Sequence, residues 1–205
     1  MRFTLRFFFI FIFFLSLCKY QYAQKDTATF NRKKEVVFDN KRYRVYNSWL
    51  SAGAGISYNT KWPKDERNTG VDFSFYIKDQ IFRIGAFASG ADFHAINNYN
   101  LHLCYGYRKE SGKFNVSAFL GPSYSYFKRP LKDSLDYDLS KTYNAFGVYA
   151  VIEGVYKVKY DIGIGAQLFC DYNPKQMIYG VRFIAYFSGA YRGLKRGYRA
   201  PNKNR

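Results

Sequence analysis

The sequence is poor in the residues from which most metal and nucleophilic centres are built. It has three cysteines and two histidines in 205 residues, with neither a His-x-His nor a Cys-x-x-Cys spacing. Beyond the first twenty residues only Cys104 and Cys170 occur, and two cysteines are too few for a disulfide framework. The two cysteines fall on opposite faces of alternating segments, so a disulfide bond between them is not expected. We predict two free thiols that serve as small buried or lipid-facing residues.

The chain also has no internal run of 18 apolar residues, which excludes an ordinary transmembrane helix. Its one long apolar run, Phe7–Leu17, lies at the start, behind Arg2 and Arg6, and Tyr22-Ala23-Gln24 follows it. A basic start, a short apolar stretch and a small residue at the end are typical of a secretory signal peptide. We therefore predict export, with a signal peptide at 1–23 that is cleaved after Ala23.

The alternative leader is a lipoprotein signal that ends in Leu15-Ser16-Leu17-Cys18. Bacterial lipidation sites normally have a small residue before the cysteine, and Leu17 is not small. A retained membrane anchor would need about 20 apolar residues, and the run is much shorter. Cleavage after Ala23 is the preferred interpretation.

Acidic residues are scarce, with 15 against 32 basic ones, for a formal charge of +17 that falls to +14 without Arg2, Arg6 and Lys19. A strongly basic balance is typical of nucleic-acid binding, but export argues against a nucleic-acid partner. The excess lies at the two ends of the mature chain. Lys25–Arg44 holds seven basic and three acidic residues, and the tail after Phe187 holds six basic and no acidic ones.

Aromatic residues, in contrast, are abundant at 21%, and alternation of apolar and polar side chains runs through most of the chain. The segment Met177–Phe187 carries it most clearly. One face is wholly apolar and ends in Phe187, whereas the other holds Gly180 and Arg182. A side-chain period of two is the mark of a β-strand, and Arg182 must point to the polar side.

The same period predicts eight strands, each long enough for a tilted membrane strand of about 9–11 residues. Their expected ranges are Trp49–Asn59, Thr69–Lys78, Ile81–Ser89, Asn98–Lys109, Lys113–Phe127, Tyr143–Lys157, Tyr160–Tyr172 and Met177–Phe187. Pro122 lies within the fifth and suggests a bulge. Short and long connections alternate, as in transmembrane barrels, so an even strand count places both termini on the short-turn, periplasmic side.

The composition of the two faces separates a membrane barrel from a soluble, lipocalin-like one. In a soluble barrel the polar face meets water and carries charges freely. Here glycine, serine and asparagine dominate the polar rows, while tyrosine and phenylalanine cluster at the ends of the apolar rows, as in aromatic girdles at two membrane interfaces. We predict an all-β fold, an eight-stranded antiparallel up-and-down transmembrane β-barrel.

The region Trp49–Phe187 resembles the small eight-stranded outer-membrane barrels of the OmpA/OmpX type. Its last strand is similar to their closing strand, in which alternating aromatics follow a glycine, although Ala185 stands at a usually bulky position. The Tyr22-Ala23-Gln24 junction and the phenylalanine and tyrosine content are similar to those of Bacteroidota envelope proteins. The resemblance implies an outer-membrane location and a structural, adhesive or accessory role without turnover. The expected domains are the leader 1–23, an N-terminal extension 24–48, the barrel 49–188 and a basic tail 189–205.

Several charged residues fall on the inward rows of the predicted strands. The expected interior ionic network comprises Asp72, Arg83, Arg108, Glu153, Lys157, Asp161 and Arg182, and Lys113 and Asp171 also lie on inward rows. Buried charges require partners, and we expect Glu153 to pair with Arg182 or Arg83 where glycines leave room. The favoured role is a polar plug; a narrow pore is the alternative.

Catalysis is a further alternative, because some small barrels modify lipid A with a His and a Ser near the membrane surface. The candidates are His94, His102, Ser89 and Ser123. Their spacing defines no triad, and there is no G-x-S-x-G elbow. The acidic loop Asp133–Asp138 suits weak calcium binding less well than a solvated, self-neutralised loop. We therefore predict no catalytic residue, no metal site and no cofactor.

The charged ends are the one functional clue. Unpaired basic residues in the periplasm attract anionic head groups, peptidoglycan carboxylates or an acidic protein face. The tail residues that would form this basic periplasmic surface are Arg192, Lys195, Arg196, Arg199, Lys203 and Arg205. The expected function is a non-enzymatic outer-membrane barrel, a structural or accessory subunit that contacts membrane lipid and docks peptidoglycan or an acidic periplasmic or outer-membrane protein. A tail that is merely solvated is the competing interpretation.

Overall fold

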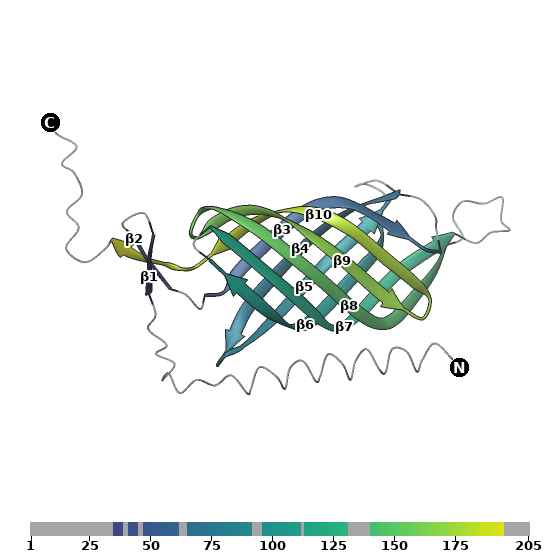
Figure 1. Ribbon diagram of the computed structural model, residues 1–205. Helices are drawn as coiled ribbons and strands as arrows, with labels where there is room; N and C mark the ends of the chain where they lie inside the picture. Colours follow the sequence, from purple (N-terminus) through teal and green to yellow (C-terminus); the bar gives the residue numbers. More distant parts are fainter. Residues whose placement is uncertain are drawn as a thin grey trace. The chain divides into compact units, whose positions relative to one another are not determined.

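A computed structural model describes residues 35–38, 41–44, 47–61, 65–91, 96–111, 113–130 and 140–194. The predicted signal peptide 1–23 lies outside these residues, as does most of the basic tail. Eight strands close into an all-antiparallel barrel in which each strand pairs with its sequence neighbours (Figure 1). These strands are β3 (Trp49–Asn59), β4 (Asp65–Ile77), β5 (Gln80–Gly90), β6 (Ile96–Glu110), β7 (Phe114–Pro130), β8 (Ser140–Lys159), β9 (Ile162–Asn173) and β10 (Gln176–Ser188).

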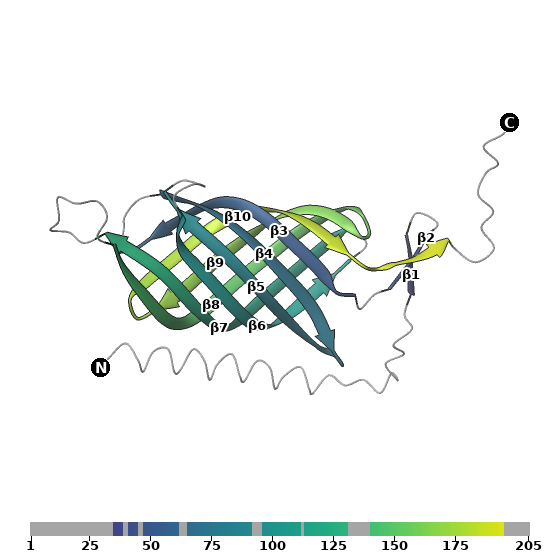
Figure 2. The ribbon, with the colours of Figure 1, turned by 180° about the vertical axis from the view of Figure 1, so that it is seen from behind.

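The barrel closes between its first and last strands. β10 pairs with β3 over the whole length of β3, from Trp49 opposite Ser188 to Asn59 opposite Ile178. The view from behind shows the same tilted strands continuing round the cylinder (Figure 2). Closure leaves no open sheet edge, which is the condition for a sheet to cross a membrane. Within the described part of the chain no helix is long and apolar enough to span a bilayer.

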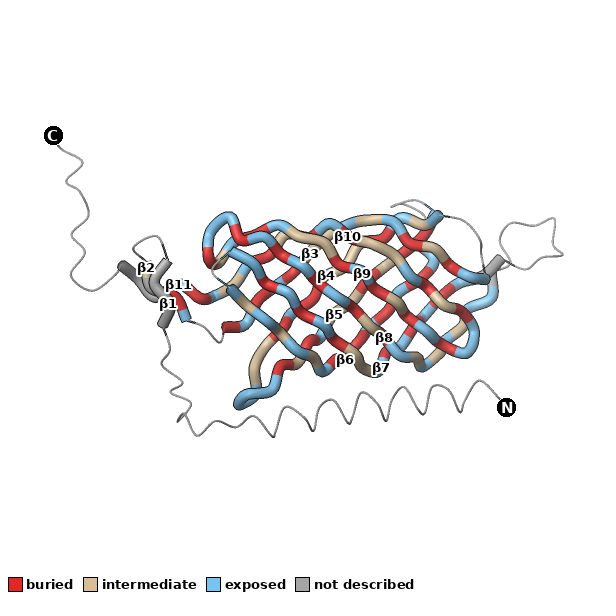
Figure 3. The backbone as a smooth tube through the Cα atoms, in the orientation of Figure 1, coloured by how far each residue is buried: buried red, intermediate tan, exposed pale blue. Residues whose placement is uncertain are grey.

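The inward and outward rows are those that the alternation predicts. Figure 3 shows buried and exposed residues alternating along the strands. Outward-facing Phe146 and Phe183 are 78% and 76% exposed, whereas inward-facing Glu153 and Arg182 are 0% exposed. A soluble barrel would show the reverse distribution. Charges inside and large apolar side chains outside fit a hydrocarbon surrounding.

The strands are generally longer than the sequence predicts, because backbone pairing continues where the side chains become polar. β4 begins at Asp65 rather than Thr69, and the ladder with β3 reaches the pair Tyr58 and Asp65. The two-residue turn after β4 is tight enough to hold Lys78 at a positive φ of 57°. Polar residues beyond the apolar band therefore extend the barrel wall instead of starting the loops.

The predicted bulge at Pro122 is wrong. Gly121 and Pro122 have no partner in the β6–β7 ladder. The register is nevertheless the same before and after them, because Leu120 pairs with Tyr105 and Ser123 pairs with His102. On its other side, Pro122 stays paired with Val148 in an unbroken β7–β8 ladder. Proline removes one donor from a ladder, and here the strand tolerates that loss without inserting a residue.

Segments on both sides of the barrel in the sequence contribute to a second sheet. It consists of β1 (Glu35–Phe38), β2 (Lys41–Arg44) and β11 (Tyr191–Leu194), in the order β1-β2-β11. Within the predicted N-terminal extension, β1 is thus an edge strand of this sheet. The first part of the predicted tail is a strand as well, β11, while residues 195–205 lie outside the described part of the chain.

Candidate functional site

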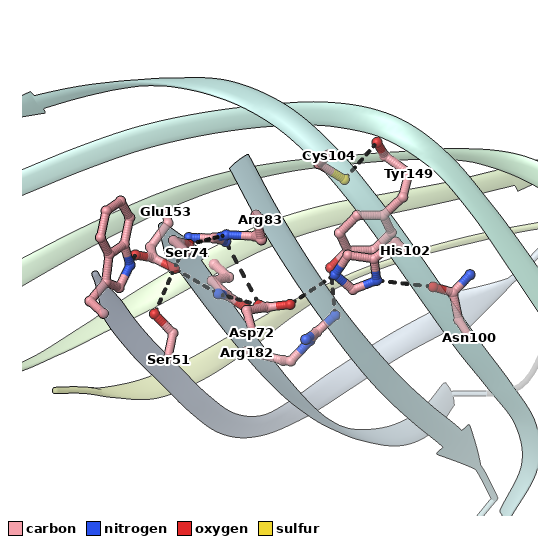
Figure 4. A network of polar contacts seen from close by, with 12 residues as sticks. Ser51, Asp72, Ser74, Arg83, Asn100, His102, Cys104, Tyr149, Glu153 and Arg182 are labelled. Carbon is pink, nitrogen blue, oxygen red and sulfur yellow. Dashed lines mark hydrogen bonds and ion pairs between the residues drawn. The ribbon is translucent and has the colours of Figure 1, made fainter. Parts of the chain in front are cut away.

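Glu153 of β8 lies at the centre of a polar network inside the barrel (Figure 4). Its carboxylate accepts a hydrogen bond of 2.8 Å from Arg83 Nη2, and this contact is also an ion pair between fully buried side chains. Three neutral donors complete its coordination: Trp49 Nε1 at 3.2 Å, Ser51 Oγ at 3.0 Å and Gln167 Nε2 at 2.8 Å. A buried carboxylate thus has four donors from β3, β5 and β9.

Asp72 of β4 is the second carboxylate of the network. Its Oδ1 lies 2.8 Å from His102 Nε2, and its Oδ2 lies 2.9 Å from Gln167 Nε2 and 3.7 Å from Arg83 Nη1. A Cβ at Gly85 would collide with Asp72 Oδ1 and His102 Nε2. The glycine therefore provides the room in which this contact forms.

A chain of hydrogen bonds continues from His102 toward the long-connection end of the barrel. The imidazole stacks on Tyr149 with ring centroids 3.9 Å apart, and its Nδ1 lies 3.1 Å from Asn100 Oδ1. Asn100 donates to Ser125 Oγ at 3.1 Å, and Ser125 donates in turn to Asp171 at 2.8 Å. Ser123 also donates to Asp171, at 2.5 Å. The interior is connected from Glu153 to Asp171.

Arg182 is buried among aromatic rings rather than beside Glu153. Its Nη2 donates to Tyr149 Oη at 2.8 Å, and its guanidinium carbon lies 4.1 Å and 5.2 Å from the ring centroids of Phe169 and Phe87. A Cβ at Gly70 would collide with the guanidinium. Of the two partners that the sequence allows for Glu153, the structure pairs it with Arg83.

A separate charged cluster lies nearer the short turns. Glu110, at the end of β6, forms an ion pair with Arg108 Nη2 at 3.0 Å and another with Lys157 Nζ. Arg108 also donates to Tyr186 Oη at 3.0 Å, and its guanidinium carbon lies 4.2 Å from the Trp49 ring centroid. Two of the expected interior cations therefore belong to this cluster rather than to the central one.

Asp161 is not brought into either cluster. It lies half-buried in the turn between β8 and β9, because β9 begins one residue later at Ile162. Its backbone carbonyl accepts a hydrogen bond of 2.8 Å from the Ser188 amide. Lys113 likewise precedes β7 and is exposed.

The three-stranded sheet packs on that same turn. Tyr43 of β2 and Tyr160 are both buried, with ring centroids 4.7 Å apart, and Ala190 completes this small core. The Arg44 amide donates to the Ala190 carbonyl at 2.8 Å. Burial raises the pKa of the Tyr160 phenol, so it is neutral at physiological pH. Arg192 belongs to β11, while Lys195, Arg196, Arg199, Lys203 and Arg205 lie outside the described residues.

Among the described catalytic candidates, His102 forms no hydrogen bond with Ser89 or Ser123. His102 is buried between Asp72 and Asn100, while Ser123 donates to Asp171 and Ser89 to Glu66. His94 and the acidic loop Asp133–Asp138 lie outside the described residues. Across the described part of the chain, no group of three His, Cys, Asp or Glu side chains is arranged to hold a metal. Cys104 and Cys170 are free thiols, as predicted.

The sequence interpretation missed the neutral members of the network. All of these lie on the inward rows of the alternating pattern, and this position was the one indication in the sequence that could have identified them: Trp49, Ser51, Tyr149 and Gln167. Glu110 lies one residue beyond the predicted strand Asn98–Lys109, because β6 continues to Glu110.

Comparison with known proteins identifies the fold. No protein-family profile and no curated protein matches the sequence. Among solved structures, the chain is similar to Neisserial surface protein A, with a TM-score of 0.55 and 10% identity over 68% of this chain and 96% of that one. It is also similar to the N-terminal β-barrel domain of Pseudomonas aeruginosa OprF, with a TM-score of 0.52 and 10% identity over 70% and 98%.

At this identity the likeness concerns the fold alone. The outward apolar band of this chain is the surface that such a fold presents to lipid. The chain is therefore a small eight-stranded transmembrane β-barrel of the outer-membrane type.

Proposed function

We propose that this barrel is a non-enzymatic structural or accessory subunit of an envelope assembly, and that it docks an acidic partner on its basic short-turn end. The observation that carries the proposal is the three-stranded sheet, in which the N-terminal extension and the start of the tail pair with one another. A chain end that served only as a solvated tail would have no reason to form such a sheet.

The contacts with the barrel make this sheet a fixed platform. Tyr43 is 3% exposed and Ala190 is 0% exposed, so the sheet buries side chains against the turn that holds Tyr160. Two backbone hydrogen bonds link the segments that run between the barrel and the sheet. The Arg44 amide donates to the Ala190 carbonyl, and the Gly189 amide donates to the Ser48 carbonyl. A backbone held in this way keeps the basic strands at one end of the barrel, which favours specific docking over diffuse attraction.

The charge of the platform indicates the chemistry of the partner. Its strands contain Lys41, Arg42, Arg44 and Arg192 against the single acidic residue Glu35. The tail beyond β11 adds five basic residues. Basic clusters attract carboxylates over about 8 Å at physiological ionic strength. Suitable partners are the carboxylates of peptidoglycan or an acidic protein face.

The interior supports a structural role over the two alternatives. Large side chains fill the barrel cross-section, including Arg83 over the Phe119 ring at 4.0 Å and Arg182 over Phe169. An eight-stranded barrel has room only for side chains, so a continuous water path is not favoured. His102, the histidine of the network, is only 3% exposed, which argues against its action on a membrane lipid.

Charge neutralisation at the platform tests the proposal in the full-length mature protein. The test variant replaces three arginines of the platform strands, Arg42, Arg44 and Arg192, with glutamine, so that no reactive amine is lost. The matched control replaces three lysines of the opposite end, Lys61, Lys141 and Lys175. Washed envelopes are cross-linked with a short amine-reactive reagent at 50 and 300 mM salt, and the products are assigned to peptidoglycan or to a protein.

The proposal expects one cross-linked species that is lost in the test variant, kept in the control variant and weakened at high salt. Equal cross-linking of both variants would overturn the docking surface. A changed lipid A profile after His94→Ala or His102→Ala would overturn the non-enzymatic assignment, and steady unit currents in planar bilayers would overturn the filled interior.

A further inference from the structure

The outer wall of the barrel has a hollow that the proposed function does not use. Its volume is about 530 Å³, and it lies over β5, between β4 and β6. Small side chains form its floor at Ala86 and Ala88. Taller side chains flank it, with Leu101 61% exposed and Val71 45% exposed. The hollow therefore lies in the face of the barrel that meets acyl chains.

The register places this hollow in one half of the membrane. On β6, Tyr99 and Tyr107 stand at the two aromatic ends of the outward row, and Leu103 lies midway between them. Leu103 pairs with Ile84 of β5. Ile84 is large and 54% exposed, and it stands on the outward row one position before Ala86, where the lining of the hollow begins on this strand. The hollow extends from there toward the long connections, so it lies in that half of the barrel wall.

The hollow is short along the strands and wider across them. Its lining covers residues 69–71 of β4, 86–88 of β5 and 99–101 of β6, with Tyr124 and Tyr126 of β7. A rise of about 3.3 Å per residue makes roughly 7 Å along each strand, whereas four strands about 4.8 Å apart make roughly 14 Å across them. Part of a single acyl chain of the outer leaflet would fill this area, whereas a transmembrane protein segment would also have to pass Ile84.

Polar and cationic groups lie at the end of the hollow that is nearest to the long connections. The Tyr99 and Tyr126 side chains border the hollow, as does Thr69. Two residues further along their strands, Arg67 on β4 and Lys128 on β7 are exposed on the outward rows. Asp65 is the exposed acidic residue nearest to them on the outward row of β4. An acyl chain in the hollow would thus place its head group beside two cations, which favours phosphate.

We propose that this hollow binds one acyl chain of a phosphorylated, multiply acylated glycolipid of the outer leaflet, of lipid A chemistry, with its phosphate beside Arg67 and Lys128. The proposal rests on the outer-membrane location within the proposed function, because the hollow opens toward the leaflet in which such a glycolipid resides. It is independent of the basic platform, which lies at the other end of the barrel.

Native mass spectrometry of the full-length mature protein in a neutral detergent tests the proposal. The probes are bis-phosphorylated lipid A, its dephosphorylated form and phosphatidylcholine, titrated separately. Ala88→Phe fills the hollow. The matched control is Ala166→Phe, an outward alanine on β9, four strands from β5 in either direction round the barrel. Heat-dependent gel mobility confirms that each variant forms a folded barrel.

The wild-type protein is expected to retain one bis-phosphorylated lipid A, with at least tenfold preference over phosphatidylcholine. Ala88→Phe should lower lipid A retention at least tenfold, and Ala166→Phe should leave it unchanged. The pair Arg67→Gln and Lys128→Gln should abolish the difference between phosphorylated and dephosphorylated lipid A.

Equal retention of phosphatidylcholine, or equal effects of the two phenylalanine variants, would overturn the proposal. A protein dimer that Ala88→Phe abolishes would assign the hollow to a second copy of the chain and would overturn it too. None of these results bears on cross-linking at the platform, so the two proposals fail separately.

Discussion

Replacement of Arg83 by methionine should be among the most damaging single changes in the barrel. Arg83 is 0% exposed, and it bonds Glu153 at 2.8 Å and Ser74 at 2.9 Å. Methionine retains much of the length of the side chain but none of its charge. The carboxylate of Glu153 would remain, with three neutral donors but no cation within 4 Å of it.

The size of the loss follows from the number of donors that remain. Removing one partner of a buried ion pair typically destabilises a protein by about 3–5 kcal/mol, because the other charge is left uncompensated. Since Trp49, Ser51 and Gln167 still donate to Glu153, we expect the lower end, about 3 kcal/mol. That corresponds to roughly a hundredfold change in the folding equilibrium.

A double-mutant cycle separates the ion pair from the loss of volume. Arg83→Met, Glu153→Gln and the double variant are unfolded by urea in lipid vesicles, with the fluorescence of buried Trp49 as the signal. We expect the double variant to lose less than the sum of the single variants, by at least 1 kcal/mol. A loss below about 1 kcal/mol for Arg83→Met, or strict additivity, would refute a network held by charge pairing.

Three further changes test the orientation of the wall, the packing of the interior and the docking of the small sheet. Phe183 lies midway along the outward row of β10 and is 76% exposed, so Phe183→Arg should lower the free energy of unfolding in lipid vesicles by about 2–4 kcal/mol. Phe187→Arg, at the membrane boundary, should lower it by only about 0–1 kcal/mol, and equal losses would contradict the membrane-facing assignment. Gly85→Ala should cost about 1–3 kcal/mol in urea unfolding, because its Cβ would collide with interior side chains, while Gly154→Ala, whose Cβ would have open space, should change little. Tyr43→Ala should speed amide hydrogen exchange in β2 and β11 and leave the barrel strands unchanged, since its ring packs the sheet on the β8–β9 turn; unchanged exchange in the sheet would contradict that packing.

The amino-acid pattern was sufficient for the barrel because the environment acts on each strand separately. Every outward residue meets lipid and every inward residue meets a crowded polar interior, so the two rows of Met177–Phe187 can be assigned without knowledge of their neighbours. The same reasoning placed Arg83, Glu153 and Arg182 inside. The reasoning failed outside the apolar band, at the start of β4 and at Asp161. There the chain leaves the membrane, and the surroundings no longer differ between the two faces of a strand.

The pairings inside the barrel and the sheet at its end were decided only by the tertiary structure. Strand tilt and register determine that Glu153 meets Arg83 across the barrel while Arg182 packs on aromatic rings, and neither can be read from one strand alone. Because β3 and β10 are neighbours in the closed barrel, the two ends of the chain emerge side by side and pair as β2 and β11. Residues about 150 positions apart thus form one sheet, since closure of the barrel brings them together at little further cost in chain entropy.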